Sequence, residues 1–272
     1  INKALEYSQL QKGSGPVEVA PQTQYQFDNI VAESASMRNV CEMIRRVAPL
    51  DIPVLICGET GTGKDLIAKT IHANGPKKAK RLLQVNCATL PEPVLEFELL
   101  GISQASGLPW VKGERKGIFE NAFGSSVLLK EVGWTPPRLQ SKLFAVLLRD
   151  EVKRVGSNEP ITVSCRILAT SNIPLQRLVE DGHVQQDLYS LLNVVPIEIA
   201  PLRDRLEDIK PLFYHFLLAK VGKDGKVPVI DGELWPVLES YAWHGNVREL
   251  EIAVTYALQT LDGGKITKNS LP

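Results

Sequence analysis

The stretch that decides the fold is Val54-Leu55-Ile56-Cys57-Gly58-Glu59-Thr60-Gly61-Thr62-Gly63-Lys64-Asp65. Its four apolar residues predict a buried strand, and its glycines allow the following turn to bring backbone N–H groups close to an anion. The lysine adds a positive charge where a helix begins, and the helix dipole favours the same anion. This order predicts a cradle for the phosphate groups of a nucleotide. The alternative is an ordinary glycine turn between a strand and a helix.

Outward from this loop, apolar strands alternate with amphipathic helices, which is typical of a parallel sheet with helices on both faces. We expect strands at residues 54–57, 83–86, 126–129, 166–170 and 195–199, and helices near 34–48, 63–74, 92–100, 136–149 and 184–192. After about residue 201 the pattern predicts helices alone, roughly at 207–221, 231–241 and 245–260.

The fold class predicted is therefore α/β, with a helical subdomain appended at the C-terminal side. Residues 1–26 are polar and contain a Gly-Ser-Gly-Pro breaker, so we expect a linker from a missing N-terminal domain there. The nucleotide-binding α/β core is expected at residues 27–201 and the helical subdomain at 202–272.

The composition is that of a globular protein with a core of ordinary size, since 44% of the 272 residues are hydrophobic. The 31 basic and 31 acidic residues balance, so DNA contact is expected only from a local patch or an absent domain. The cysteines show no CxxC spacing, which predicts reduced thiols in a cytoplasmic protein. The histidines lack metal-ligand spacing, so we predict no metal site, and no apolar run suits a membrane span.

A second chemical signal lies where the strand at 126–129 ends, in Lys130-Glu131. In nucleotide hydrolases an aspartate at such a strand end binds magnesium, and the following glutamate positions the attacking water, so Glu131 is a remnant of that motif. Lys130 removes a metal ligand and adds a positive charge, while Asp65 stands where serine or threonine usually completes the loop. We predict a cradle that binds a nucleotide without hydrolysing it. In the alternative, Lys130 turns to solvent and Asp65 or Glu131 recruits magnesium.

Many segments together resemble the central AAA+ domain of bacterial enhancer-binding, sigma-54-activator-like transcription regulators. The resemblance covers about residues 26–272 and rests on the phosphate loop together with Gln84-Val85-Asn86-Cys87-Ala88, Arg115-Lys116-Gly117-Ile118-Phe119-Glu120, Arg154-Val155-Gly156, Asp187-Leu188-Tyr189, Leu192-Asn193-Val194-Val195-Pro196-Ile197, Pro201-Leu202-Arg203-Asp204-Arg205 and Trp243-His244-Gly245-Asn246-Val247-Arg248-Glu249-Leu250. It implies an AAA+ P-loop core, binding of ATP or ADP, and self-association into a ring.

The resemblance also implies which residues contact the nucleotide. Ile30 and Val31 match the apolar wall around the base, and Asn172 and Arg248 match the residues that sense the phosphates. Arg203 is a further candidate. A core role for Ile30 and Val31, and a surface ion pair between Arg248 and Glu249, are the alternatives.

Three positions or segments depart from what the family implies for catalysis. Gln185 and Leu191 replace the two arginines that a neighbouring subunit offers to the nucleotide, and residues 102–114 lack the Phe-Thr tip that engages the RpoN-class sigma factor. Trp110 in that segment either contacts another partner or packs on its own domain. Loss of catalysis with retention of binding predicts a regulator that neither hydrolyses ATP nor engages that sigma factor. An active ATPase that remodels RNA polymerase with substituted catalytic residues is the alternative, and a scaffold that binds no nucleotide is a third.

Within the family, the pattern most resembles atypical response regulators of the VpsR kind, which control biofilm genes with the housekeeping polymerase. The resemblance allows cyclic di-GMP as the controlling ligand and implies DNA binding through a missing C-terminal domain. Arginines suit a dinucleotide that carries two phosphates and two guanines, and the candidates are Arg45, Arg46, Arg203 and Arg205. For each of them a solvated surface charge is the alternative.

Overall fold

The computed structural model describes residues 27–104, 113–222 and 226–272. The expected linker at 1–26 and Trp110 lie outside the described residues. A sheet of five parallel strands forms the centre, in the order β2 (Leu83–Asn86), β5 (Ser126–Lys130), β8 (Arg166–Ser171), β1 (Val54–Cys57) and β9 (Pro196–Glu198). The strands are parallel and pair in register, so their carboxyl ends share one edge. The predicted sheet is confirmed.

Helices cover both faces of this sheet because alternate strand residues point to opposite sides. Val54 and Ile56 pack with the buried residues of α2 (Ala35–Val47) and α3 (Lys64–Ala73). Leu55 and Cys57 pack on the other side with α4 (Glu92–Leu100), α5 (Ile118–Asn121), α6 (Pro137–Arg149), α7 (Leu175–Glu180) and α8 (Gln186–Leu192). All four residues of β1 are buried, as expected for a strand with helices on both sides.

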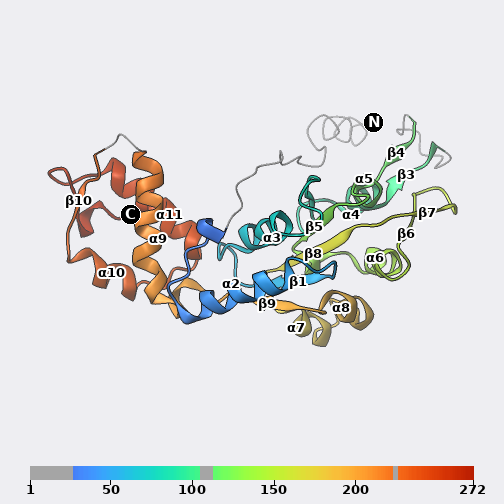
Figure 1. The fold of residues 1–272 in the computed structure, drawn as a ribbon, viewed down its shortest axis with the longest axis horizontal. Helices are drawn as coiled ribbons and strands as arrows, with labels where there is room; N and C mark the ends of the chain where they lie inside the picture. The colour runs from blue at the N-terminus through green and yellow to red at the C-terminus, as the bar shows by residue number, and fades with distance from the viewer. Residues whose placement is uncertain (1–26, 105–112, 223–225) are drawn as a thin grey trace.

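Several short elements of the core have no counterpart in the sequence prediction. Besides α5 and α7, they are two antiparallel ribbons, β3 (Gly101–Ile102) with β4 (Arg115–Lys116) and β6 (Glu151–Lys153) with β7 (Pro160–Thr162), and the turns η1 (Phe27–Asn29) and η3 (Val132–Trp134). Elements of two to six residues do not show a hydrophobic period, and tertiary contacts stabilise them instead. The ribbons extend at the end of the molecule opposite α9–α11 (Figure 1).

Residues 202–272 form a separate cluster of helices, called here the helical region. It contains α9 (Ile209–Val221), α10 (Leu234–Ser240) and α11 (Asn246–Gln259), with the turns η4 (Leu202–Asp204), η5 (Leu206–Asp208) and η6 (Lys268–Ser270). Its core is built around Phe213, Leu250 and Trp243. The expectation that strands cease after residue 201 is wrong in detail, because β10 (Val229–Ile230) pairs with β11 (Lys265–Ile266). Two extended loops lie side by side there, and a pattern of two residues gives no strand signal. Within the described part of the chain, no helix is long and apolar enough to cross a membrane.

Candidate nucleotide site

The glycine-rich loop joins β1 to α3 at the carboxyl edge of the sheet. Gly63 caps α3 with φ of 106°, a left-handed conformation that favours glycine. Lys64 begins the helix and is only 6% exposed. Its ammonium donates to the carbonyls of Gly58 (2.7 Å) and Glu59 (3.1 Å), so the loop folds around its own lysine. The loop therefore presents a buried cation and a helix N-terminus at one point.

Two neighbouring strand ends supply the polar groups beside this lysine. Glu131 directly follows β5 in a left-handed conformation, with φ of 52°, and its backbone N–H donates to Thr170 Oγ1. Its carboxylate accepts a hydrogen bond from the backbone N–H of Asn172 (2.9 Å) and lies 3.6 Å from the Lys64 ammonium. The Asn172 side-chain oxygen is buried without a hydrogen-bond partner. The structure thus brings the phosphate loop, Glu131 and Asn172 together.

Lys130 and Asp65 form an ion pair at the same edge. The ammonium of Lys130, at the end of β5, lies 2.5 Å from the carboxylate of Asp65 in the first turn of α3. Lys130 therefore does not turn to solvent away from the site. The resemblance implies a magnesium ion here, but these residues do not fit one, because the Asp65 and Glu131 carboxylates each lie beside a lysine ammonium. No group of three His, Cys, Asp or Glu side chains suited to a metal occurs among the described residues.

The helical region holds the outer side of the loop through Glu59. Arg203 donates two hydrogen bonds to the Glu59 carboxylate, of 2.8 and 2.5 Å, and these hydrogen bonds are the main reason that the pKa of Glu59 falls to about 2. The buried amide of Asn246 donates to the Glu59 carboxylate (3.1 Å) and the Thr60 carbonyl (3.0 Å). Its oxygen accepts from the backbone N–H of Leu202 (2.8 Å). These hydrogen bonds attach the loop to the helical region.

The tip of the loop touches the start of α11. A Cβ on Gly61 would lie 2.1 Å from the Gly245 carbonyl oxygen, so only glycine allows this approach. The backbone N–H of Arg248 donates to the Gly61 carbonyl. The expected alternative of a pair with Glu249 is not seen, since that carboxylate accepts from Tyr241 Oη and from the Gly245 N–H. The exposed Arg248 side chain thus starts beside the loop.

A buried ion pair links the loop to the first helix of the core. Arg205 donates to the Thr62 carbonyl (3.2 Å) and lies 3.7 Å from the Asp208 carboxylate. Asp208 accepts from the backbone N–H groups of Glu33 and Ser34, both at 2.8 Å, and from the Ser34 hydroxyl. Burial lowers the pKa of Arg205. This chain of contacts runs from the phosphate loop to the residue that caps α2.

Ile30 and Val31 are both half-buried between the two parts of the molecule. Ile30 packs against the cluster that contains α2 and α3, whereas Val31 packs against the core of the helical region. Both residues therefore pack in a hydrophobic core, which was the alternative to a base-binding role. Packing of this kind does not exclude contact with a base between the two parts.

The four arginines proposed for a dinucleotide separate into two pairs. Arg203 and Arg205 bond to the phosphate loop. Arg45 lies over the ring of Phe27 at 4.9 Å, and Arg46 pairs with Glu42 on its own helix. The structure therefore gives Arg45 and Arg46 local partners outside the loop.

The two altered arginine positions lie on and beside α8, away from the phosphate loop of the same chain. Gln185 precedes α8, and its amide donates to the Pro137 carbonyl (3.3 Å) and the Ser141 hydroxyl (3.1 Å) at the start of α6. Its side chain thus fixes α8 to α6 and carries no charge to offer a neighbouring subunit.

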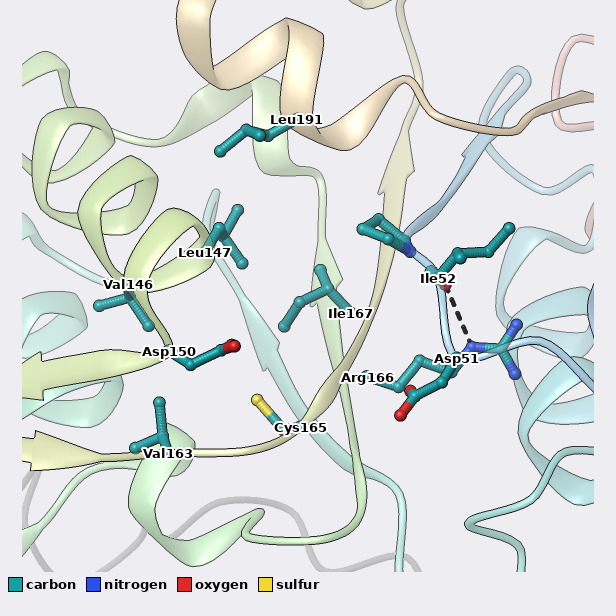
Figure 2. A pocket seen from close by; sticks show the side chains of 11 residues that line it. Asp51, Ile52, Val146, Leu147, Asp150, Val163, Cys165, Arg166, Ile167 and Leu191 are labelled. Atoms are coloured by element: carbon teal, nitrogen blue, oxygen red, sulfur yellow. Dashed lines mark hydrogen bonds between the residues drawn. The ribbon is translucent and has the colours of Figure 1, made fainter.

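Leu191 lines a cavity of about 220 Å³ at the opposite, amino end of the sheet (Figure 2). It lies across from Leu147 and Ile167, and the Arg166 guanidinium at the rim donates to the Ile52 carbonyl (3.3 Å). Burial raises the pKa of the nearby Cys165 thiol to about 12. Leu191 is half-buried and carries no charge, so this position offers no cation to a neighbouring subunit.

Two important contacts escaped the sequence prediction. Asn246 is fully buried and left-handed, with φ of 54°, and it binds both the loop and η4. The Arg205–Asp208 pair is equally buried. A Gly-Asn turn before a helix was the available signal for Asn246, because asparagine tolerates the left-handed conformation. No local pattern indicates the partner of a buried Asp208.

Comparison with protein families agrees with this geometry. Residues 30–198 match the model described as the sigma-54 interaction domain, and residues 203–272 match the AAA+ ATPase lid domain. The chain therefore belongs to the sigma-54 interaction domain family, and its fold is the AAA+ P-loop fold with a helical lid region.

Particular relatives support this assignment. The Nif-specific regulatory protein of Azotobacter vinelandii is 42% identical over 247 residues, which are 90% of this chain and 47% of the relative. The HTH-type transcriptional regulatory protein TyrR of Salmonella typhimurium is 41% identical over 238 residues, 87% of this chain and 45% of the relative. A crystal structure of NtrX from Brucella abortus with ADP has a TM-score of 0.80 and 28% identity, and it covers 100% of this chain and 58% of that one. The chain spans about half the length of these relatives.

Proposed function

We propose that this chain is the nucleotide-responsive central domain of a bacterial transcription regulator, and that it binds ATP or ADP without hydrolysing ATP. The observation that supports this most strongly is the Lys130–Asp65 ion pair of 2.5 Å beside an intact phosphate loop. The NtrX structures with ADP and with ATP support the class of ligand.

Several parts of a hydrolytic site are altered together. The strand-end aspartate is a lysine, the positions of both trans-acting arginines are Gln185 and Leu191, and a finger arginine alone contributes roughly 10³–10⁵ in rate. The phosphate loop, Asn172 and Arg248 are kept. The second candidate is an active ATPase with substituted residues, and it is favoured by the retained Glu131 carboxylate, which still lies 3.6 Å from Lys64.

The proposed partners follow from the family and from the altered segment. The protein would associate with copies of itself and act in the cytoplasm with RNA polymerase. Because residues 102–114 contain neither phenylalanine nor threonine, we propose the housekeeping holoenzyme in place of the RpoN-class form. DNA contact would come from a further C-terminal domain, as the HTH-type relative suggests. We also propose that the protein is related to VpsR-type regulators and is controlled by cyclic di-GMP. The proposed domain organisation is a linker at 1–26, a core at 27–201 and a helical subdomain at 202–272.

The decisive experiment measures phosphate release from magnesium-ATP at concentrations where sedimentation confirms self-association. We expect no release above background, and we expect a fluorescent ATP analogue to bind, with a loss of at least about tenfold in Lys64→Ala. Turnover of about 1 per second or faster, as in ordinary enzymes, would establish the active ATPase instead. Absence of binding by the unaltered chain, together with unchanged self-association in Lys64→Ala, would support the scaffold that binds no nucleotide.

A further inference from the structure

We propose that the site takes its nucleotide free of divalent metal, with the Lys130 ammonium in the place of the metal ion. The inference rests on the proposed nucleotide-binding function and specifies the form of the ligand. Its basis is the position and the charge of four side chains at the carboxyl edge of the sheet.

Lys130 lies at the carboxyl edge of the sheet, beside the phosphate loop. It ends β5, in register with Asn86 of β2, so its side chain begins at the edge where the phosphate loop leaves β1. The loop continues directly into Asp65, which the ammonium contacts at 2.5 Å. Lys130 therefore reaches the first turn of the helix whose N-terminus faces the predicted phosphates.

The charges beside the loop balance in pairs. Two cations and two anions pair here, Lys64 with Glu131 at 3.6 Å and Lys130 with Asp65 at 2.5 Å. A divalent ion would have to take Asp65 from Lys130 and then remain next to two ammonium groups, which repel it. A polyphosphate is attracted to the same two ammonium groups, since lysine binds phosphate as a point charge.

The Lys130–Asp65 ion pair is accessible to solvent and can open. The side chains of Lys130 and Asp65 are 27% and 42% exposed, so Asp65 can turn to water when a phosphate oxygen takes its place. Next to this cluster, the buried side-chain oxygen of Asn172 accepts no hydrogen bond from the protein, and a bound water would satisfy it. A phosphate oxygen of a metal-free nucleoside di- or triphosphate can thus replace Asp65 beside the Lys130 ammonium.

The test measures ATP and ADP binding by calorimetry in EDTA and in excess magnesium. For the unaltered chain we expect tighter binding in EDTA than in excess magnesium, because magnesium competes with the site for the free nucleotide. Lys130→Met should weaken binding at least about tenfold in EDTA. The matched control is Lys142→Met, because Lys142 also pairs with a single acid, Glu96, but lies on α6. It should bind like the unaltered chain.

A second variant reverses the charge. Lys130→Asp places two carboxylates at the edge, so its binding should be weak in EDTA and be restored at least about tenfold by magnesium. The inference is overturned if the unaltered chain binds the nucleotide at least about tenfold more weakly in EDTA than in excess magnesium. This outcome does not depend on whether the variants fold. The proposed function fails differently, through phosphate release or through absence of binding in both buffers.

Discussion

At the scale of single residues, Glu59 and Arg203 join the phosphate loop to the helical region. The two hydrogen bonds from Arg203 lower the pKa of Glu59 from 4.5 to about 2. A carboxyl group with a lowered folded-state pKa stabilises the fold above its unfolded pKa, and this stabilisation is lost as the pH falls from about 4.5 towards 2. Because both side chains are 40% exposed, solvent screens the pair.

We predict that Arg203→Met returns the pKa of Glu59 towards 4.5, since the carboxylate loses its main donor. Carboxyl-carbon NMR titration of the unaltered and the variant chain measures this directly. Arg177→Met is the control, because Arg177 is an exposed arginine of α7 outside the loop. A Glu59 that titrates near 4.5 in the unaltered chain would contradict the observed pairing.

At the scale of elements, Asp208 connects the helical region to the start of α2. Its carboxylate satisfies the backbone N–H groups of Glu33 and Ser34, while the Ser34 hydroxyl caps the helix at Met37. We predict that Asp208→Ala lowers the free energy of unfolding by about 3–5 kcal/mol, because it leaves the buried Arg205 guanidinium without its counter-charge. Urea unfolding measures this loss.

The loss should be accompanied by faster hydrogen exchange at the amides of residues 33–37, which begin α2. Glu207→Ala is the matched control, since this neighbouring acid is exposed and should change stability by less than about 0.5 kcal/mol. Equal effects of the two variants would mean that Asp208 does not couple the elements.

At the scale of the whole molecule, one loop is shared by the sheet core and the helical region. A nucleotide bound there should therefore stabilise both parts together, in a single thermal transition. At a ligand concentration about 100 times the dissociation constant, the gain is about 2.7 kcal/mol, or about 5–10 °C for a chain of this size. Differential scanning calorimetry with ATP in EDTA measures the shift.

Lys64→Ala should abolish this shift, whereas Lys142→Met should keep it. If calorimetry shows two separate transitions and ATP raises the temperature of only one, the nucleotide-bound loop does not stabilise the helical region.

The sequence by itself determined the fold class and the phosphate loop. A buried strand, a glycine turn and an amphipathic helix each result from neighbouring residues, and so β1, α3 and the other four strands of the sheet could be predicted from local patterns. The strand-end pattern identified Lys130 as a replacement, and the resemblance to the family identified Gln185 and Leu191.

Only the tertiary structure decided what these residues contact. Arg203 meets Glu59 across 144 positions and Asn246 meets Glu59 across 187, and no local period encodes such pairs. The Lys130–Asp65 pair likewise forms because parallel strands bring their carboxyl ends to one edge, where the first turn of α3 begins. Short ribbons and the buried Asp208 arise in the same way, because their stability comes from long-range contacts and not from the residues that flank them.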